Sequence, residues 1–316
     1  MRVLETSKSE QGGLRFGERP APLPQQGQVL IDVQHISLNL GEVRRVAMGT
    51  MVDGVVPGWD AAGVISAVGP DTDAPPVGTR VVSRALVGGW AEKRVAHVDD
   101  IAVVPDGVEM ATASTLPTAA TTALAVLTRG GPLLGRTVLI TGASGSVGRF
   151  AIQLAKIGGA RVIASVSSEA SAQSLAGLGA DRVILGLEGA GGADLIVETL
   201  GGPTLVECLR LVNPGANVVN IGWSSRQQAI FSDLGALNKG GALHSFGIGD
   251  YRVGPYLRVL LSLLEDGRLT SAIKLQTSWD NFASANAAVM QRGYHGKVVL
   301  TQGHTVHGAT RSTSTA

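Results

Sequence analysis

Cysteine is almost missing from this sequence, because Cys208 is the only one in 316 residues. An intramolecular disulfide is therefore impossible, and a zinc site built from several cysteines is excluded with it. Cys208 lies in an apolar, helix-like stretch, residues 205–211, where we expect an inert buried thiol. The sequence offers no disulfide framework and no cysteine-rich metal site.

Basic clusters and long apolar runs are also missing. The formal net charge is +1 and no basic run exceeds Arg44-Arg45, whereas nucleic-acid binding needs clustered cations. The richest apolar run, residues 256–264, is far shorter than the roughly 18–20 residues that span a bilayer. Residues 1–16 lack the apolar core of a secretion signal. We therefore expect a cytoplasmic protein with no nucleic-acid or membrane partner.

What remains is a globular composition rich in glycine. Hydrophobic residues make up 44% and charged residues 16%, which favours a folded core over disorder. The 43 glycines lie in turns and loops rather than in a low-complexity tract. A chain of 316 residues exceeds the usual size of one domain, so we expect two.

The spacing of apolar segments changes along the chain. The first 110 residues contain short strands between proline and glycine turns, which is typical of a β-rich domain. Beyond them, fully apolar strands alternate with helical stretches, which indicates an α/β fold with a doubly wound parallel sheet covered on both faces. The predicted strands are 29–33, 61–68 and 78–82, then 138–141, 161–166, 194–197 and 217–221; the predicted helices are 146–157, 169–178, 255–267 and 282–290. Residues 273–300 return to strand, helix and strand, and are expected to rejoin the first domain.

A glycine-rich loop follows the first strand of the α/β part. Gly142, Gly145 and Gly148 open a helix inside one βαβ unit of about 30 residues, the context that a dinucleotide site requires. Glycine allows the sharp turn, the approach of backbone N–H groups to a pyrophosphate and close packing of the helix. The helix N-terminus adds unpaired N–H groups and positive dipole. The loop predicts dinucleotide binding, and the other loop residues expected there are Ser144, Ser146 and Val147.

The second strand of this unit decides between NADH and NADPH. Sites for NADH usually place an aspartate or glutamate at its end, on the ribose 2′-hydroxyl. Here the strand ends with Ser165, Ser167 and Ser168, and the first carboxylate is Glu169. Serine hydroxyls can hydrogen bond to a 2′-phosphate, which a carboxylate would repel. We predict NADPH; the alternative is a serine-rich loop without a role.

Several short stretches, taken in order, resemble the quinone oxidoreductase branch of the medium-chain dehydrogenase/reductase superfamily over residues 1 to about 300. Besides the glycine loop they are Ser37-Leu38-Asn39, Pro57 to Val64, Gly88 to Glu92, Leu116-Pro117 with Thr121-Thr122-Ala123, Leu178 to Asp181, and Gly296 to Leu300. The resemblance implies a Rossmann domain, residues 113–267, inserted in a GroES-like catalytic domain formed by residues 1–112 and 268–301. Residues 302–316 are expected to form a disordered tail.

The resemblance also implies that zinc is absent. Zinc-dependent relatives have a cysteine ligand where this chain has Asn39, and Gly-His-Glu where it has Gly58-Trp59-Asp60. Asparagine and tryptophan are unsuitable zinc ligands. Asp60 is then either a catalytic group or a buried structural carboxylate, and Trp59 either an apolar wall for a flat substrate or a core residue.

Site residues follow from the same resemblance. Asn39 is expected to line the active site near the nicotinamide, Thr122 to contact the cofactor, and Arg292 to reach the 2′-phosphate. Gly222, Ser224 and Arg226 follow the predicted strand 217–221, where the family binds cofactor.

Arg44 stands where some relatives have a tyrosine. Arginine stays charged and cannot donate a proton in the reaction. It either holds an oxyanion or an anionic substrate, or it is a solvated helix residue.

The predicted function is NADPH-dependent hydride transfer to a quinone, an enone or another activated alkene, with a small molecule as the partner. Two alternatives stay open: an enoyl-thioester reductase of a biosynthetic pathway, and a non-enzymatic NADPH-binding protein. Relatives pair the sixth strand, residues 243–249, across a twofold axis, so a homodimer is expected.

Overall fold

The computed structural model describes residues 1–10, 12–232, 240–249, 251–291 and 293–303. Arg292 and residues 304–316 lie outside this part, so the predicted role of Arg292 and most of the expected tail are not described. Gln302, where that tail was expected to begin, is buried and donates to the carbonyl of Ala91 at 2.8 Å. It is therefore an ordered extension of the last strand.

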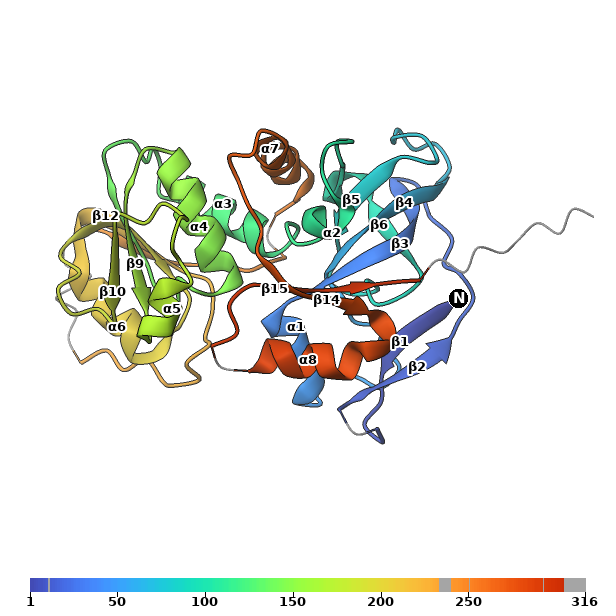
Figure 1. Cartoon of the computed structure of the whole chain (residues 1–316), viewed down its shortest axis with the longest axis horizontal. Helices are drawn as coiled ribbons and strands as arrows, with labels where there is room; N and C mark the ends of the chain where they lie inside the picture. Colours follow the sequence, from blue (N-terminus) through green and yellow to red (C-terminus); the bar gives the residue numbers. More distant parts are fainter. Residues whose placement is uncertain (11, 233–239, 250, 292, 304–316) are drawn as a thin grey trace, which may run out of the picture.

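One large sheet combines strands from both ends of the described chain (Figure 1). Its order is β14-β15-β3-β4-β5-β7, and β6 also pairs with β3. These strands are β3 (Gln28–Leu38), β4 (Asp60–Val68), β5 (Arg80–Arg84), β6 (Lys93–His97), β7 (Ile101–Val103), β14 (Ile273–Ser278) and β15 (Lys297–Thr301). Strand β15 runs antiparallel to β3, with Val298 opposite Leu38. The C-terminal strands thus join the N-terminal β-rich region; the predicted domain boundaries themselves stay predictions.

Short elements surround this sheet. A separate hairpin is formed by β1 (Arg2–Thr6) and β2 (Leu14–Glu18), and the helices are α1 (Leu40–Ala47), α2 (Met110–Ala113) and α8 (Phe282–Met290). Figure 1 shows α1 and α8 side by side below the sheet, in contact with each other. Two 3₁₀ turns, Val98–Asp100 and Trp279–Asn281, complete this part.

The second large sheet has six parallel strands in the order β10-β9-β8-β11-β12-β13. They are β8 (Thr137–Ile140), β9 (Arg161–Val166), β10 (Arg182–Leu185), β11 (Ala193–Glu198), β12 (Val212–Asn220) and β13 (Ala242–Ser245). The helices are α3 (Ala119–Arg129), α4 (Ser146–Ile157), α5 (Glu169–Gln173), α6 (Gly202–Leu211) and α7 (Gly254–Glu265). Strand β13, which overlaps the predicted sixth strand at residues 243–245, lies at one edge.

Alternate residues of the parallel strands face opposite layers of core. Val138 and Ile140 of β8 pack in the cluster that includes α3, α4 and α7, whereas Leu139 between them packs in the cluster that includes α6. This period of two is what a sheet covered on both faces requires. The predicted α/β fold with a doubly wound sheet is confirmed.

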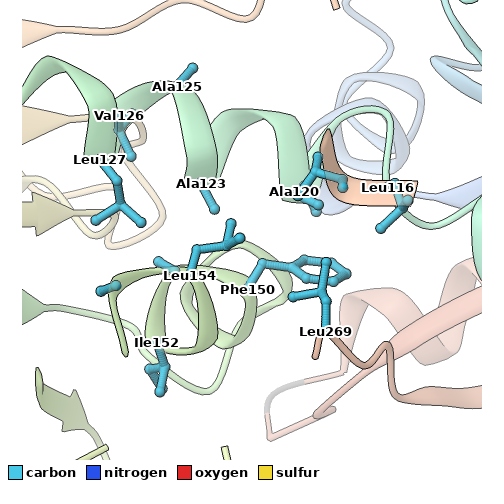
Figure 2. Packing of buried hydrophobic residues seen from close by; sticks show 14 of the residues in the cluster. Leu116, Ala120, Ala123, Ala125, Val126, Leu127, Phe150, Ile152, Leu154 and Leu269 are labelled. Carbon is cyan, nitrogen blue, oxygen red and sulfur yellow. The ribbon is translucent and has the colours of Figure 1, made fainter. Parts of the chain in front are cut away.

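Helices α3 and α4 pack directly on each other. Figure 2 shows Phe150 and Leu154 of α4 facing Ala120 and Ala123 of α3, with Leu269 beside Phe150. Burying each large side chain here contributes about 1.5–3 kcal/mol. The contact fixes the glycine-loop helix against the helix that carries Thr122.

Two local predictions are corrected. The helix expected over 169–178 ends at Gln173, and the chain continues as turns in which Gly177 adopts φ +79°. Strand β10 was not predicted, since its residues are mostly exposed and give no clear alternation. In the described part, no helix is both long and apolar enough to cross a membrane.

Candidate active site

The glycine loop has the shape that the sequence predicted. Gly142 adopts φ +55°, and a Cβ there would collide with Oγ1 of Thr199. A Cβ on Gly148 would lie 2.6 Å from Cα of Ala143. Gly145 is the N-cap of α4 and provides no capping side chain, so the first N–H groups of the helix have no side-chain partner. These donors fit a pyrophosphate, and Ser144, Ser146 and Val147 lie half-buried around them.

The serines that end β9 divide into two kinds. Ser165 is buried and donates to the carbonyl of Gly186 at 2.7 Å, whereas Ser167 and Ser168 are exposed. The hydroxyl oxygens of Ser168 and Ser171 lie 2.9 Å apart. The adenosine ribose of a dinucleotide binds at this strand end, so two of the three predicted serines are accessible to it.

His295 joins these serines, although the sequence gave no sign of it. Its Nε2 lies 3.2 Å from Oγ of Ser171, and the ring also hydrogen bonds to the backbone of Ser144 in the glycine loop. Burial lowers the pKa of His295, and the cations Arg149 and Lys274 lower it further. We call Ser168, Ser171, His295, Arg149 and Lys274 the His295 cluster. No described carboxylate forms an ion pair with its two permanent cations.

A buried carboxylate organises the ends of the central parallel strands. The carboxylate of Glu198 accepts hydrogen bonds from the backbone of Leu200 and Gly201 and from Nδ2 of Asn220 at 2.6 Å. Ser224, one of the predicted residues, donates to the carbonyl of Thr199 at 3.0 Å. The loop after β12 is thereby held against the loop after β11, at the carboxyl edge where ligands bind in open parallel sheets.

An open cavity of about 470 Å³ lies at this edge. Gly201, Gly222 and Trp223 are among the residues that line it. Arg226 follows in the same loop with φ +60°, an unusual conformation for a residue with a side chain, and its side chain is exposed.

A second polar group is buried where β3, β4 and β15 meet. It consists of Asn39, Glu42, Asp60 and Lys297, which we call the Asn39 cluster; each is less than a tenth exposed. Lys297 Nζ donates to Oδ1 of Asn39 at 2.8 Å and to the carbonyl of Leu38 at 3.0 Å. Asn39 Nδ2 donates to Asp60 at 3.0 Å and to Glu42 at 3.2 Å.

The carboxylates of the Asn39 cluster have further donors. Thr118 donates to Asp60 at 2.6 Å, and the backbone N–H groups of Asn39 and Trp59 donate to Glu42, each at 2.7 Å. Burial raises the pKa of Asp60, and burial with the nearby Asp60 charge raises the pKa of Glu42 to about 8. Burial also lowers the pKa of Lys297, against the attraction of both acids. Asp60 is therefore a fully buried partner in a network, as the structural interpretation of this residue expected.

The network fixes the orientation of the Asn39 amide. An ammonium only donates hydrogen bonds, so Oδ1 faces Lys297, and Nδ2 faces the carboxylates, which accept. Both the oxygen and the nitrogen of the Asn39 amide thus form hydrogen bonds with other side chains of the protein. It is held in one rotational state at the start of α1, which is a property of a positioning residue.

Thr122, the predicted cofactor contact, lies beside a tyrosine that sequence reasoning missed. The hydroxyl of Tyr251 is 3.0 Å from Oγ1 of Thr121 and 3.4 Å from Oγ1 of Thr122. The guanidinium of Arg84 lies over the Tyr251 ring, 4.5 Å from its centre, and donates to the Tyr251 carbonyl at 2.7 Å. These contacts connect β5 of the seven-stranded sheet to α3, which packs on the six-stranded parallel sheet.

Trp59 packs against helix α1, and Arg44 belongs to that helix. The Trp59 ring packs so closely on Gly41 that a Cβ there would be 2.8 Å from it. Arg44 is three residues after Gly41 and therefore on the same side of the helix. Its Nε is buried without a hydrogen-bond partner, and Arg226 is near enough to lower the pKa of Arg44, after the larger effect of burial. The fold thus brings two predicted site arginines together, one from each sheet region.

Metal ligands are not gathered anywhere in the described residues. No group of three or more His, Cys, Asp or Glu side chains there could hold a metal ion. Burial raises the pKa of the Cys208 thiol, which is buried in the cluster that includes α6.

Comparison with known proteins covers both sheet regions. The chain matches the family model of the alcohol dehydrogenase GroES-like domain over residues 25–106, and that of the zinc-binding dehydrogenase over residues 146–262. Erythronolide synthase EryA2 of Saccharopolyspora erythraea is 34% identical over 305 residues, which are 90% of this chain but only 8% of that protein. Quinone oxidoreductase of Sus scrofa is 27% identical over 300 residues, 88% of this chain and 90% of that protein.

Solved structures show the same fold. The crystal structure of AibC has a TM-score of 0.85 at 29% identity, and the alignment covers 96% of this chain and 95% of that one. Mycobacterial Rv1454c in complex with NADPH has a TM-score of 0.83 at 24% identity, covering 95% of this chain and 100% of that one. The likeness to Rv1454c shows that the two chains share a fold. NADPH is bound to Rv1454c in that structure.

Proposed function

This chain is an oxidoreductase of the medium-chain dehydrogenase/reductase superfamily, and from that premise we propose that it reduces a quinone, an enone or another activated alkene with NADPH and without zinc. The observation that carries the zinc-free chemistry is the Asn39 cluster. The end of β9 supports NADPH, and the likeness to quinone oxidoreductase supports the substrate class.

Lys297 supports the absence of zinc. Its ammonium lies 2.8 Å from Asn39, which stands where the zinc-dependent relatives have a cysteine ligand, and 3.9 Å from Asp60, which directly follows Trp59 at the histidine position. A fixed cation at this distance repels a divalent ion and occupies the lone pairs that the ion would use. The ammonium of Lys297 thus lies where a zinc ion would otherwise need the oxygens of Asn39 and Asp60.

The residues present fit a dinucleotide. The first N–H groups of α4 would hold the pyrophosphate, and Ser167 and Ser168 would face the adenosine ribose with hydroxyls and no carboxylate. When bound, NADPH supplies a hydride. Thr122 and Tyr251 lie at the junction with the antiparallel sheet and would position the reactive end of the cofactor.

Trp59 and Arg44 are the side chains proposed to meet the substrate. The half-buried indole offers a flat apolar surface on α1, and the Arg44 guanidinium lies on the same side of that helix. Reduction of an enone or quinone places negative charge on oxygen, and a nearby guanidinium with an unused N–H stabilises that charge.

The test is turnover by the purified chain on benzoquinone, cyclohexenone and a crotonyl thioester, with NADPH and NADH in parallel. We expect consumption of NADPH with at least one acceptor, a lower kcat/KM with NADH, and no change after treatment with a zinc chelator. Loss of activity on chelation and recovery with zinc would overturn the zinc-free mechanism. NADPH binding without turnover on any acceptor would favour the non-enzymatic alternative.

A second candidate is reduction of an enoyl thioester carried on phosphopantetheine. It is supported by the pair Arg44 and Arg226, two cations that approach each other without a described acid between them, and by the likeness to EryA2, a polyketide synthase by name. Two adjacent guanidinium groups repel unless an anion binds both, and the phosphate of the carrier arm is such an anion.

Paired substrates distinguish this candidate from the first. We expect Arg44→Ala and Arg226→Ala each to lower kcat/KM for crotonyl-phosphopantetheine by about fivefold, the effect of a charge-assisted contact of about 1 kcal/mol after solvent screening. Crotonyl-pantetheine, which lacks the phosphate, should be affected less. Arg45→Ala, in the adjacent exposed position, is the matched control. Equal losses on both substrates would leave only the simple alkene reductase.

A further inference from the structure

We propose that His295 binds the 2′-phosphate of NADPH and takes up a proton when it does so, which makes the preference for NADPH over NADH depend on pH. The inference rests on the proposed use of NADPH and adds a specificity residue to it. His295 lies in the segment between α8 and β15, three residues after Arg292, whose predicted contact with the same phosphate falls outside the described residues.

Geometry places the ring at the adenosine end of the site. His295 Nε2 is 3.2 Å from Oγ of Ser171, which in turn is 2.9 Å from Oγ of Ser168, the last of the serines after β9. The same ring hydrogen bonds to the backbone of Ser144 in the glycine loop. His295 therefore spans the interval between the pyrophosphate loop and the end of β9, where the ribose 2′ position of a Rossmann cofactor lies.

Among the described residues, the charged groups that act on the ring are all cations. Arg149 of α4 and Lys274 of β14 face it as cations, whereas Ser171 and Ser144 bring no charge. On its own segment, Tyr294 has a hydroxyl that is buried without a partner. Glu169, the only acid in the first turn of α5, is exposed and does not act on the ring. Such a group of cations without an acid is suited to an incoming anion.

The same surroundings determine how the ring titrates. In the free protein, burial and the two cations lower the pKa of His295, so the ring is mostly neutral at neutral pH. A phosphate dianion beside it reverses the local field and favours the imidazolium. NADPH binding should therefore take up a proton, and its affinity should fall as the pH rises through the interval between the two pKa values. NADH has no 2′-phosphate and lacks this linkage.

The experiment is calorimetric titration of NADPH and NADH at about pH 6 and about pH 8, on either side of the ordinary histidine pKa of about 6.5. Two buffers with different ionisation enthalpies at each pH give the number of protons taken up. For the wild type we expect NADPH affinity to fall by roughly three- to tenfold between the two pH values, since one linked proton gives at most tenfold per pH unit.

Three variants make the result specific. His295→Gln keeps a hydrogen-bonding side chain but no titration, and should weaken NADPH about tenfold at the lower pH while NADH changes less than twofold. His295→Lys stays charged and should bind NADPH with a flatter pH dependence. His97→Gln, at a half-buried histidine of β6 in the seven-stranded sheet, should match the wild type.

The phosphate itself titrates near pH 6, and its contribution remains in every variant, so the comparison with wild type removes it. Equal proton uptake by the wild type and His295→Gln would overturn the inference. The same pH dependence with NADH would overturn it as well, because the contact would then be with the pyrophosphate. Failure of the wild type to bind NADPH would instead overturn the proposed function.

Discussion

The Asn39 cluster and the His295 cluster differ in the balance of their charges. In the Asn39 cluster, the acids Glu42 and Asp60 attract the ammonium of Lys297. The same two acids also attract the buried guanidinium of Arg94. In the His295 cluster no described acid accompanies the cations: Arg149 donates to the Ser174 carbonyl, and Lys274 lies over the Tyr294 ring. Both clusters use segments that are far apart in the sequence. Only the Asn39 cluster contains both acids and cations, so that its buried charges attract one another.

The difference shows how structural and binding polar groups can be told apart. A buried network whose carboxylates and ammonium are matched has no need of a ligand, and its removal should affect folding first. A half-exposed group of cations carries uncompensated repulsion, which an anion relieves, so its removal should affect binding first. Three predictions test this contrast.

The largest effect is expected at Lys297. Lys297→Met removes the ammonium from the Asn39 cluster and leaves the buried Asp60 and Glu42 with their uncharged hydrogen-bond donors and the field of Arg94. Breaking a buried pair in this way costs about 3–5 kcal/mol. Urea denaturation should show that loss in the free energy of unfolding, and a cost below about 1 kcal/mol would mean that the cluster is not a folding element. Lys274→Met, an exposed lysine of the other cluster, is the control.

Glu42 should give the stability of the protein a pH dependence. Burial raises the pKa of Glu42 from its ordinary value of 4.5 to about 8 in the fold, so the folded state retains a proton that the unfolded state loses. Stability from this group is complete below about pH 4.5 and is lost as the pH rises through about 8, at no more than about 1.4 kcal/mol per pH unit. Denaturation series for the wild type and Glu42→Gln should therefore converge at high pH or cross. Parallel series would refute the assignment.

Arg149 offers the smallest and sharpest comparison. Arg149→Gln removes the first of the two cations that lower the pKa of His295, and keeps an amide that can donate to the Ser174 carbonyl. The pKa of His295, followed by NMR of the ring protons, should rise. The free energy of unfolding should change by about 1 kcal/mol or less, since no ion pair is broken. An unchanged histidine pKa would mean that the His295 cluster is not electrostatically coupled.

The parts that could be predicted from the sequence are those encoded locally. The strands and the glycine loop follow from apolar runs and from spacing, and Gly142 and Gly148 are required by contacts within a few residues or with the adjacent strand. Ser167 and Ser168 were found because they end a recognisable strand. Site assignments such as Thr122 and Ser224 remain predictions that the contacts described here make testable.

The parts that could not be predicted depend on distant segments. Glu42, Tyr251 and His295 have no motif of their own, and each acquires its role only when another strand or helix reaches it. Lys297 did leave a signal: a lysine directly before Val298-Val299-Leu300, in a strand with no exposed face, must have a buried partner. No sequence rule names that partner.

The reach of Lys297 to Asn39 has a consequence for synthesis. The two residues are 258 positions apart, and Lys297 opens the last described strand. While the chain emerges from the ribosome, Asp60, Glu42 and Arg94 are already present, whereas Lys297 is not. The seven-stranded sheet therefore stays incomplete until the six-stranded parallel sheet and its helices have been synthesised. Closing a loop of this length costs conformational entropy before the contacts between its ends can stabilise the sheet. The early chain would then be an open intermediate with an unpaired sheet edge, the stage at which a chaperone would have most to protect.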